Sequence, residues 1–340
     1  MRIGDLLGEL GDPRVDQLYQ PTVLHDEGRF VPLAGGLSRI GRENPHSAAL
    51  EKYREKVPAT PPVEGTLKNF SIAAYPVTNC EYKKFIENGG YNEERYWPDP
   101  LSRQWAAGEP EAVNKLLELA NAAAHTHLAS ELAAERITLD DIHGWLGKLV
   151  RRRKPMFWEY PRFNRANQPV VGINWWEAHA YCMWQTEFLH GAGRLTNAQV
   201  LRLPTEAEWE VAARRCGVGG PFPWESGDAA QNALVRATTN GSLQRALAVG
   251  SFGFVSSRLP IYDIVGNVWE WTGSKTGPYS KVTFEQTYDT NGVDDRIARG
   301  SSWMSSEVEA AEVTFRSFDP PYNAYEDLGF RLVMFDTAQF

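Results

Sequence analysis

The sequence predicts an α+β protein rich in loops. Twelve Trp residues occur together with 29 Gly and 21 Pro in 340 residues, a composition typical of long loops anchored by aromatic side chains. Two strand-like runs are each followed by an amphipathic helix with its own capping signal. Beyond residue 217 no clear helix pattern is present, and short strand-like runs alternate with Gly, Pro, Asn and Trp. These observations favour small sheets and a few helices over a regular bundle.

The first hundred residues predict an arm followed by the start of the main domain. Residues 1–27 are expected to form a short N-terminal helical arm, and residues 28–340 the main domain. The stretch Gly28–Gly41 predicts a β-hairpin, because two apolar runs flank a Gly-Gly pair. Leu67–Asn79 is expected to be a strand, and a short helix follows with Thr78 or its neighbour as N-cap.

A helical insertion is expected to interrupt the main domain at residues 101–153. Its first part is rich in Ala and Leu with helical periodicity. A second helix is indicated by Thr138 and Asp141, which match a capping box. The basic run Arg151–Lys154 at the end of the insertion is interpreted as a solvated helix end or linker.

Two further helices are predicted with defined starts. Asn174 is the expected N-cap of the first, whose apolar side includes Trp175 and Cys182. The second begins at Thr205, and Glu208 completes its capping box. Both helices follow strand-like runs, which supports an α+β arrangement.

Charge and cysteine content narrow the classes of function. A formal net charge of −8 is unfavourable for binding nucleic acid or an anionic membrane. Cys80, Cys182 and Cys216 are too few for a disulfide framework and lack the spacing of a zinc site. The N-terminus has no apolar signal-peptide core, and no apolar run approaches the ~18 residues of a membrane span. We therefore expect a cytoplasmic protein without nucleic-acid or membrane partners.

An ordered series of motifs points to a known family. The motifs are "YPVTNCEYKKF", "QPVVGINWWEAHAYCMW", "RLPTEAEWEVAAR", "PFPW", "YDIVGNVWEWT", "RGSSW" and "LGFRLV". In this order the chain resembles the formylglycine-generating enzyme (sulfatase-modifying factor) family over roughly residues 28–333. The resemblance implies an irregular C-type-lectin-like fold, loop-rich, with the helical insertion added. The family includes copper-dependent oxidases, iron-dependent sulfoxide synthases and ligand-binding variable proteins diversified by retroelements, so the fold alone does not decide the function.

The catalytic thiols of the oxidases are missing from the corresponding positions. The resemblance implies one cysteine directly after the "RGSSWM" corner and another five positions later, where this chain has Ser305 and Ala310. Copper(I) prefers soft thiolate ligands, and neither a hydroxyl nor a methyl group replaces them. We therefore expect no copper and no formylglycine-generating activity.

The alternative to a non-catalytic protein is an iron-dependent enzyme. The sulfoxide synthases use a histidine-rich helix, and the most similar text here is "HTHLASE", with His125 and His127. Their spacing does not match a facial triad, although His143 in the next predicted helix could approach them. An oxygen-dependent metalloenzyme of this superfamily therefore stays the second hypothesis.

The motif "YDIVGNVWEWT" carries a calcium site in relatives. The resemblance implies ligands from the side chains of Asp263 and Glu270 and the backbone carbonyls of Gly266 and Val268. Carboxylate and carbonyl oxygens suit a hard cation such as calcium. The alternative is that the two carboxylates only cap the turn.

The leading hypothesis is a non-catalytic protein that binds a protein or a small molecule, of a kind that includes the retroelement-diversified variable proteins. Rigid aromatic residues mixed with Ser, Asn and one Arg between two framing strands are typical of a recognition surface. The expected ligand-binding residues are Trp303, Met304, Ser305, Ser306, Glu307, Arg316, Phe318, Asp319, Tyr322, Asn323 and Tyr325.

Overall fold

The computed structural model describes most of the chain. The described residues are Asp12, 29–42, 61–122, 138, 141, 144, 147, 150, 152–217, 220–224, 244–251, 259–277, 279, 293–305 and 308–339. Apart from Asp12, the expected helical arm at 1–27 lies outside them, so its helicity stays a prediction.

The N-terminal strands form a bent antiparallel ribbon. β1 (Phe30–Leu33) pairs with β4 (Phe70–Ala73), and β2 (Gly36–Ile40) pairs with β3 (Val63–Leu67). The hairpin expected in Gly28–Gly41 is therefore wrong in its pairing, although both strands lie there. The glycines mark the bend of the ribbon, because an added Cβ on residue 35 would meet the carbonyl oxygen of residue 67 at 2.4 Å.

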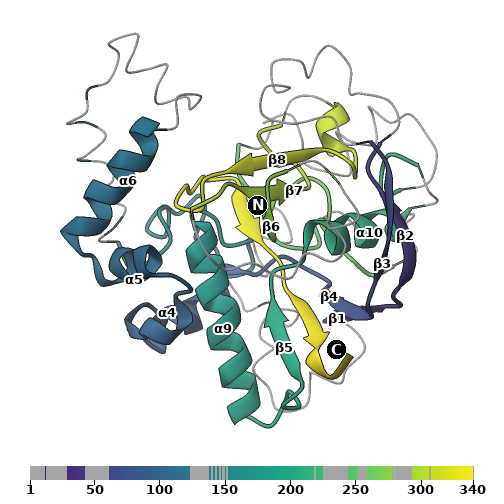
Figure 1. Ribbon diagram of the computed structural model, residues 1–340, viewed down its shortest axis with the longest axis horizontal. Helices are drawn as coiled ribbons and strands as arrows, with labels where there is room; N and C mark the ends of the chain where they lie inside the picture. Colours follow the sequence, from purple (N-terminus) through teal and green to yellow (C-terminus); the bar gives the residue numbers. More distant parts are fainter. Residues whose placement is uncertain are drawn as a thin grey trace.

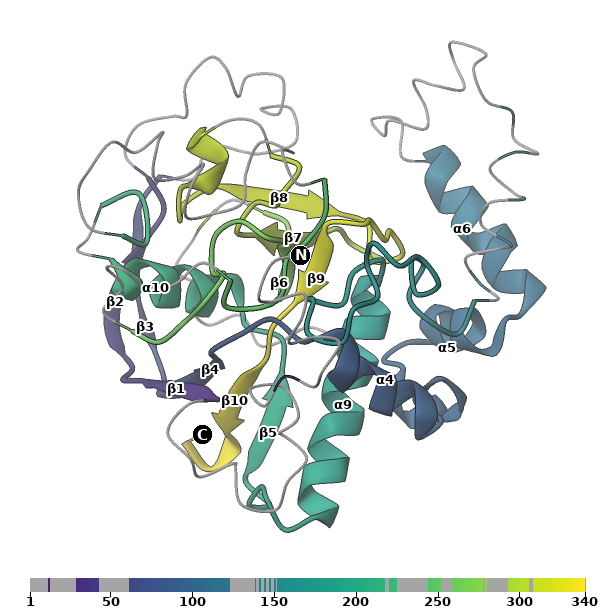
Figure 2. The ribbon, with the colours of Figure 1, turned by 180° about the vertical axis from the view of Figure 1, so that it is seen from behind.

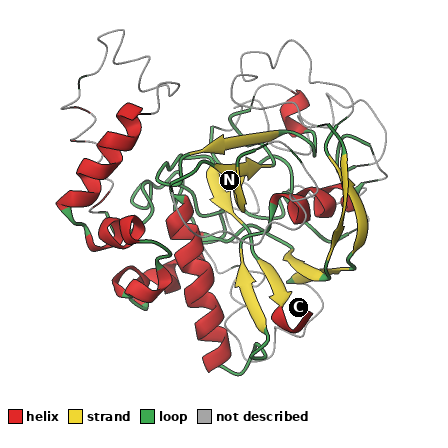
Figure 3. Ribbon diagram, in the orientation of Figure 1, coloured by secondary structure: helices red, strands yellow, loops and turns green. Residues whose placement is uncertain are grey.

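Two four-stranded sheets organise the domain (Figures 1 and 3). The first has the order β1-β4-β10-β5, in which β5 (Gln199–Arg202) and β10 (Val333–Asp336) pair antiparallel. The second has the order β8-β7-β6-β9. Its strands are β6 (Trp269–Lys275), β7 (Arg296–Arg299), β8 (Arg316–Asp319) and β9 (Leu328–Phe330), and only β6 and β9 are parallel. The ends of this second sheet position the candidate site.

Three helices begin where their capping signals predicted. They are α4 (Asn79–Glu87), α9 (Trp175–Gly191) and α10 (Glu206–Cys216). The N-caps are Thr78, Asn174 and Thr205, and each forms a complete capping box with the glutamate three residues later. α9 lies between the strands and the α4–α6 group, as Figures 1 and 2 show. Because it is covered on both sides, even Glu177, His179 and Gln185 are buried on it.

The helical insertion is partly described. The 3₁₀ turns η3 (Gly90–Asn92) and η4 (Glu94–Tyr96) lead into α5 (Pro100–Ala107) and α6 (Pro110–Ala122). A chain of aromatic rings joins it to the main core: Trp97, Trp105 and Trp176 have successive centroid distances of 5.6 and 6.3 Å. Further along, Thr138 and Asp141 make the predicted capping hydrogen bonds. The insertion therefore packs on α9 as part of one hydrophobic cluster.

Arg152, in the basic run at the end of the insertion, is anchored. Arg152 is 9% exposed at its side chain, forms an ion pair with Glu177, and donates to the carbonyl oxygen of Gly172 at 2.7 Å. Its interpretation as a solvated linker is therefore wrong for this residue. Short 3₁₀ turns η5 (Val308–Ala311) and η6 (Thr337–Gln339) complete the described elements. None of the helices that the structure describes is long and apolar enough to cross a bilayer.

Candidate functional site

The candidate site lies where β7 ends and β6 begins. Glu270 pairs with Arg299 in the sheet, so these strand ends meet. The chain leaves β7 through Gly300, which has a φ of +96°, and an added Cβ there would meet the carbonyl oxygen of Ile264 at 2.9 Å. Only glycine adopts this backbone without strain at such a close approach. The corner at residues 300–305 is therefore held tightly against the preceding loop.

Buried ion pairs on α10 support both strands that flank this corner. Glu206 accepts hydrogen bonds from Arg316 Nε at 2.8 Å and Nη2 at 2.6 Å, and from Arg299 Nη1 at 3.0 Å. Glu210 accepts from Arg299 Nη2 at 2.7 Å, and the Tyr279 hydroxyl lies within hydrogen-bond distance of both carboxylates, at 3.1 Å from Glu206 and 2.9 Å from Glu210. Burial by itself raises the pKa of Glu210, but Arg299 and neighbouring donors outweigh it, so this pKa lies below its usual value.

Arg316 belongs to this support and not to an exposed face. It is 2% exposed, and its guanidinium also donates to the carbonyl oxygen of Gly277 at 2.7 Å. The expectation that Arg316 contacts a ligand is therefore corrected. The sequence could not show this, because its partner Glu206 lies 110 residues away.

A serine–aspartate pair joins the corner to the strand on the other side of β6. Ser302 Oγ donates to Asp327 Oδ2 at 2.5 Å and accepts the Met304 N–H at 3.1 Å. The Asp327 carbonyl oxygen accepts the N–H of Trp269 at 2.7 Å, and Ser305 Oγ accepts the Ser302 N–H at 3.1 Å. Burial raises the pKa of Asp327 to about 6, with the Ser302 hydrogen bond opposing this shift. Sequence reasoning missed Ser302, Asp327 and Trp269, because only the sheet pairing brings them together.

Asp327→Asn is expected to remove a pH-dependent part of the stability. Folding raises the carboxyl pKa from about 3.8 to about 6, so the folded state holds the proton more tightly. This contribution is fully present below about pH 4 and is lost as the pH rises through about 6. The shift of roughly two units corresponds to at most about 3 kcal/mol. Urea unfolding at about pH 4 and about pH 6.5 measures it.

The matched control for this prediction is Glu93→Gln, an exposed carboxylate outside the corner. It is expected to keep the wild-type difference in unfolding free energy between the two pH values. If Asp327→Asn also keeps that difference, the raised pKa is contradicted.

Part of the expected ligand-binding surface is exposed. Met304 is 50% exposed and Tyr325 40%, whereas Phe318, Asp319 and Asn323 are half-buried. The Tyr325 hydroxyl donates to Asp319 Oδ1 at 3.0 Å and accepts from Asn323 Nδ2 at 2.9 Å. Burial and then the Asp319 carboxylate raise the pKa of Tyr325, so its hydroxyl stays protonated. We define the binding face by these five residues and the half-buried Ser305.

An adjacent loop that the sequence did not indicate lies beside the binding face. Gly172 donates to the carbonyl oxygen of Tyr325 at 2.8 Å and accepts the N–H of Met156 at 2.7 Å. In the loop after Met156, Tyr160 is 59% exposed. The Arg162 guanidinium in the same loop lies 5.4 Å from the centroid of the Trp303 ring. Arg162 therefore covers the buried Trp303 ring at the corner.

Two aromatic residues expected on the surface belong to the core. Trp303 is 6% exposed and packs in a cluster with Phe163 and Val171. Tyr322 is also 6% exposed, and its ring centroid lies 6.3 Å from that of Trp176. Their role as surface contacts is corrected, because packing over the sheet covers both rings. Ser306 and Glu307 lie outside the described residues.

Comparisons with known proteins agree with the motif order. The model of the "Sulfatase-modifying factor enzyme 1-like domain" matches residues 17–335. The chain belongs to this family. "Inactive C-alpha-formylglycine-generating enzyme 2" of Mus musculus is 28% identical over 320 residues, 89% of this chain and 84% of the relative. "Hercynine oxygenase" of Mycolicibacterium smegmatis is 30% identical over 322 residues, 90% of this chain, which spans only 61% of that relative.

Solved structures show the fold of the sulfatase-modifying factor family in this chain. "Treponema denticola variable protein 1" superposes with a TM-score of 0.52 at 18% identity, covering 89% of this chain and 94% of that one. PvdO from Pseudomonas aeruginosa gives a TM-score of 0.53 at 19% identity, with 90% and 93% covered. The α+β, C-type-lectin-like fold predicted from the motifs is thereby confirmed.

The two thiol positions of the family's oxidases are filled by structural residues. Ser305 closes a turn through its hydrogen bond with Ser302. Ala310 is 4% exposed and packs with Phe315 and the half-buried Trp269. Neither side chain can supply a thiolate for copper(I). Within the described parts of the chain, no group of three or more His, Cys, Asp and Glu side chains could hold a metal ion.

One carboxylate of the calcium site that the family resemblance implies is paired with an arginine. Glu270 is fully buried, and both of its carboxylate oxygens accept from Arg331, each at 2.6 Å. Glu270 Oε2 also accepts the indole N–H of Trp209 at 2.8 Å. Asp263 Oδ2 accepts the N–H of Gly250 at 2.6 Å. Arg331 is thus the counter-ion of Glu270 in this structure, and calcium would have to share this carboxylate with a guanidinium.

The backbone members of that set lie in the turn and in the core. Gly266 has a φ of +78° and donates to the carbonyl oxygen of Gly300 at 2.7 Å. Val268 is 1% exposed in the cluster around Trp303. The histidines of the iron hypothesis, His125, His127 and His143, lie outside the described residues.

Proposed function

We propose that this protein is a non-catalytic binding member of the sulfatase-modifying factor family. Its binding face would capture a protein or a small molecule. The observation that supports this most is that Ser305 and Ala310 stand at the positions of the two oxidase thiols. Ser305 closes a turn there, and Ala310 packs in an apolar cluster. A mouse relative whose name contains the word "inactive" supports a family branch without the oxidase chemistry.

The scaffold under the binding face supports recognition. The face stands on β8 and the corner, which the buried ion pairs of Arg299 and Arg316 fix to α10. A rigid scaffold limits the conformational entropy lost on binding, and Tyr325 and Phe318 offer large contact areas with few rotatable bonds. Side chains on such a face can change without disturbing the core.

The double variant Met304→Ala/Tyr325→Ala is expected to abolish partner capture while keeping the melting temperature within about 3 °C of wild type. Both side chains are the exposed apolar members of the binding face. Affinity capture from extract of the source organism, with quantitative mass spectrometry and a small-molecule thermal-shift screen, measures the loss.

Leu37→Ala is the matched control for this experiment. Leu37 is 74% exposed on β2, outside the binding face, and its variant should capture the same partners as wild type. Tyr322→Ala should instead lower the melting temperature, because that ring is buried. Identical capture by wild type and the double variant would reject the binding face.

A finer hypothesis is that the protein is a retroelement-diversified variable protein. The likeness to a Treponema variable protein supports only the shared fold. A near-repeat of the coding sequence for the binding face beside a reverse-transcriptase gene would support diversification. A locus with neither feature would count against it.

The alternative function is an oxygen-dependent metalloenzyme. The 30% identity with a hercynine oxygenase over 90% of this chain favours this candidate. Elemental analysis of protein purified without chelators distinguishes the two functions. Stoichiometric iron that is lost in a His125→Ala/His127→Ala variant would support the enzyme and reject the binding protein.

A further inference from the structure

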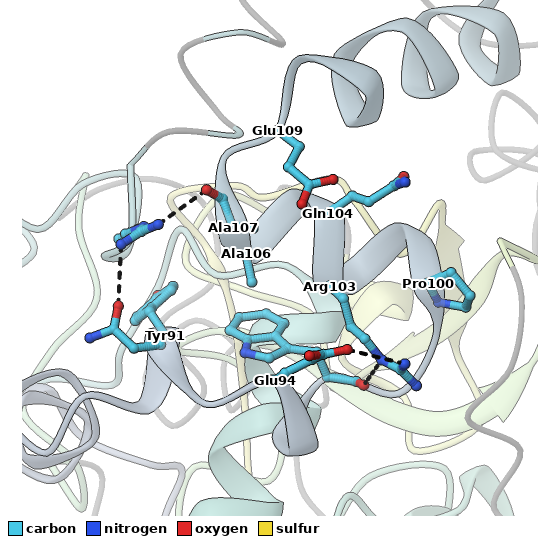
Figure 4. A pocket seen from close by; sticks show the side chains of 11 residues that line it. Tyr91, Glu94, Pro100, Arg103, Gln104, Ala106, Ala107 and Glu109 are labelled. Carbon is cyan, nitrogen blue, oxygen red and sulfur yellow. Dashed lines mark hydrogen bonds and ion pairs between the residues drawn. The ribbon is translucent and has the colours of Figure 1, made fainter.

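A pocket of about 530 Å³ lies where residues 91–100 meet the start of the insertion, and none of its lining residues belongs to the binding face. It is bounded by η3 and η4 on one side, and by α5, Glu109 and Arg153 on the other. This volume is in the range of sites for small molecules. Figure 4 shows Gln104 and Glu109 on one side of the pocket and Arg103 and Glu94 on the opposite side.

The walls of the pocket are fixed by local structure. α5 begins with a complete capping box between Asp99 and Ser102 and ends at Gly108 with a φ of +75°. Trp97 lines the pocket, is 2% exposed, and belongs to the aromatic chain that connects the insertion to α9. A preorganised wall of this kind reduces the cost of ordering on binding.

Arg153 closes one end of the pocket. Its backbone has a φ of +45°, a conformation that a residue with a side chain adopts only when its surroundings hold it there. The guanidinium donates to the carbonyl oxygen of Ala107 at 3.1 Å and to Asn92 Oδ1 at 3.2 Å. An arginine side chain has about five N–H donors. These two hydrogen bonds leave other N–H groups of Arg153 for an anionic ligand group.

The charges on the rim are balanced. Arg103 and Arg153 are cationic, Glu94 and Glu109 are anionic, and all four line the pocket. Arg103 Nη1 lies 3.4 Å from Glu94 Oε1, a long contact between exposed groups that is worth little by itself. Between the charges, Pro100, Ala106 and the Trp97 ring give an apolar wall. Such a lining complements a ligand with both charges and an apolar body better than a simple anion or cation.

We propose that this pocket binds a small zwitterion of the amino-acid type. The carboxylate would meet Arg103, the ammonium would meet the neighbouring Glu94, and the side chain would lie against the apolar wall. This inference does not depend on the binding face or on its partner.

Calorimetry with L-phenylalanine, phenethylamine and 3-phenylpropanoate tests the proposal. The first probe carries both charges, and the others each lack one. L-Phenylalanine is expected to bind with a dissociation constant on the order of 1 mM, typical of the small number of atoms that such a ligand offers. Each analogue should bind at least about tenfold more weakly, because one pair of rim charges is left without a partner.

Arg103→Gln and Glu94→Gln should each weaken binding of L-phenylalanine by about tenfold. The matched controls are Arg95→Gln and Glu93→Gln, which remove neighbouring exposed charges that do not line the pocket, and these should bind like wild type. Melting curves confirm that all four variants fold. No binding of L-phenylalanine, equal binding of the three probes, or equal effects of pocket and control variants would overturn the proposal.

Discussion

Glu206→Gln is expected to lower the free energy of unfolding by about 3–5 kcal/mol, as the loss of one partner in a buried ion pair does. Glu206 is 1% exposed and accepts hydrogen bonds from Arg299, Arg316 and Tyr279. A neutral amide removes the charge that balances two buried guanidinium groups. An amide also has only one acceptor oxygen, so donors of Arg316 are left unsatisfied. Urea unfolding at neutral pH, with the slope of the transition compared with wild type, gives this difference.

Glu118→Gln is the matched control. Glu118 forms an exposed ion pair with Lys115 on α6, and the same substitution there should leave the unfolding transition unchanged. A Glu206→Gln protein with wild-type stability would show that the guanidinium groups are compensated elsewhere. Because Arg299 and Arg316 flank the corner, the variant should also weaken partner capture at temperatures at which it remains folded.

Arg331→Met should destabilise the protein to a similar extent, again by about 3–5 kcal/mol. The guanidinium is fully buried and donates to both Glu270 oxygens and to the carbonyl oxygens of Ala73 and Tyr262. Methionine fills much of the volume but leaves the Glu270 carboxylate buried with the Trp209 N–H as its remaining described donor. The measurement is again urea unfolding.

A double variant separates the lost pairing from lost packing. Arg331→Met/Glu270→Gln removes both charges, so its unfolding free energy should lie above that of Arg331→Met alone. If the double variant is as unstable as the sum of the two single variants, the ion pair contributes no coupling energy and the assignment is contradicted.

The same ion pair predicts that the melting temperature does not respond to calcium. Since Arg331 already neutralises Glu270, addition of calcium or of a chelator should leave the wild-type melting temperature unchanged. Ligand binding to the folded state raises stability by mass action, so a site with useful affinity would appear as a shift. A melting temperature that rises with calcium but not with magnesium would show that calcium binds and would contradict this prediction.

Local signals in the sequence predicted the helix starts well. Thr78, Asn174 and Thr205 each bond to a backbone N–H only three residues away, and such contacts depend little on the rest of the chain. The predicted partner of β1 was wrong because strand pairing depends on residues far away in the sequence. Its partner β4 lies about forty residues later, and a Gly-Gly pair cannot distinguish a chain reversal from a bend.

Some features of the candidate site could be predicted from the sequence, and others could not. Ser305 and Ala310 could be recognised by their place after the Gly-Ser-Ser-Trp corner, and their side chains decide the copper question by chemistry alone. Exposure could not be read from the sequence. Phe318 and Arg316 are two residues apart on β8, yet one is half-buried at the face and the other is 2% exposed beneath it.

The amino-acid sequence by itself determined the family, the helix caps and the absence of thiols at the oxidase positions. Tertiary structure alone decided that Glu270 is paired with Arg331, that Arg316 supports the face from below, and that Ser302 meets Asp327. The physical reason is that a carboxylate becomes a ligand or a counter-ion according to the charge that folding places beside it. In this chain those charges come from Arg331, 61 residues from Glu270, and from Arg316, 110 residues from Glu206.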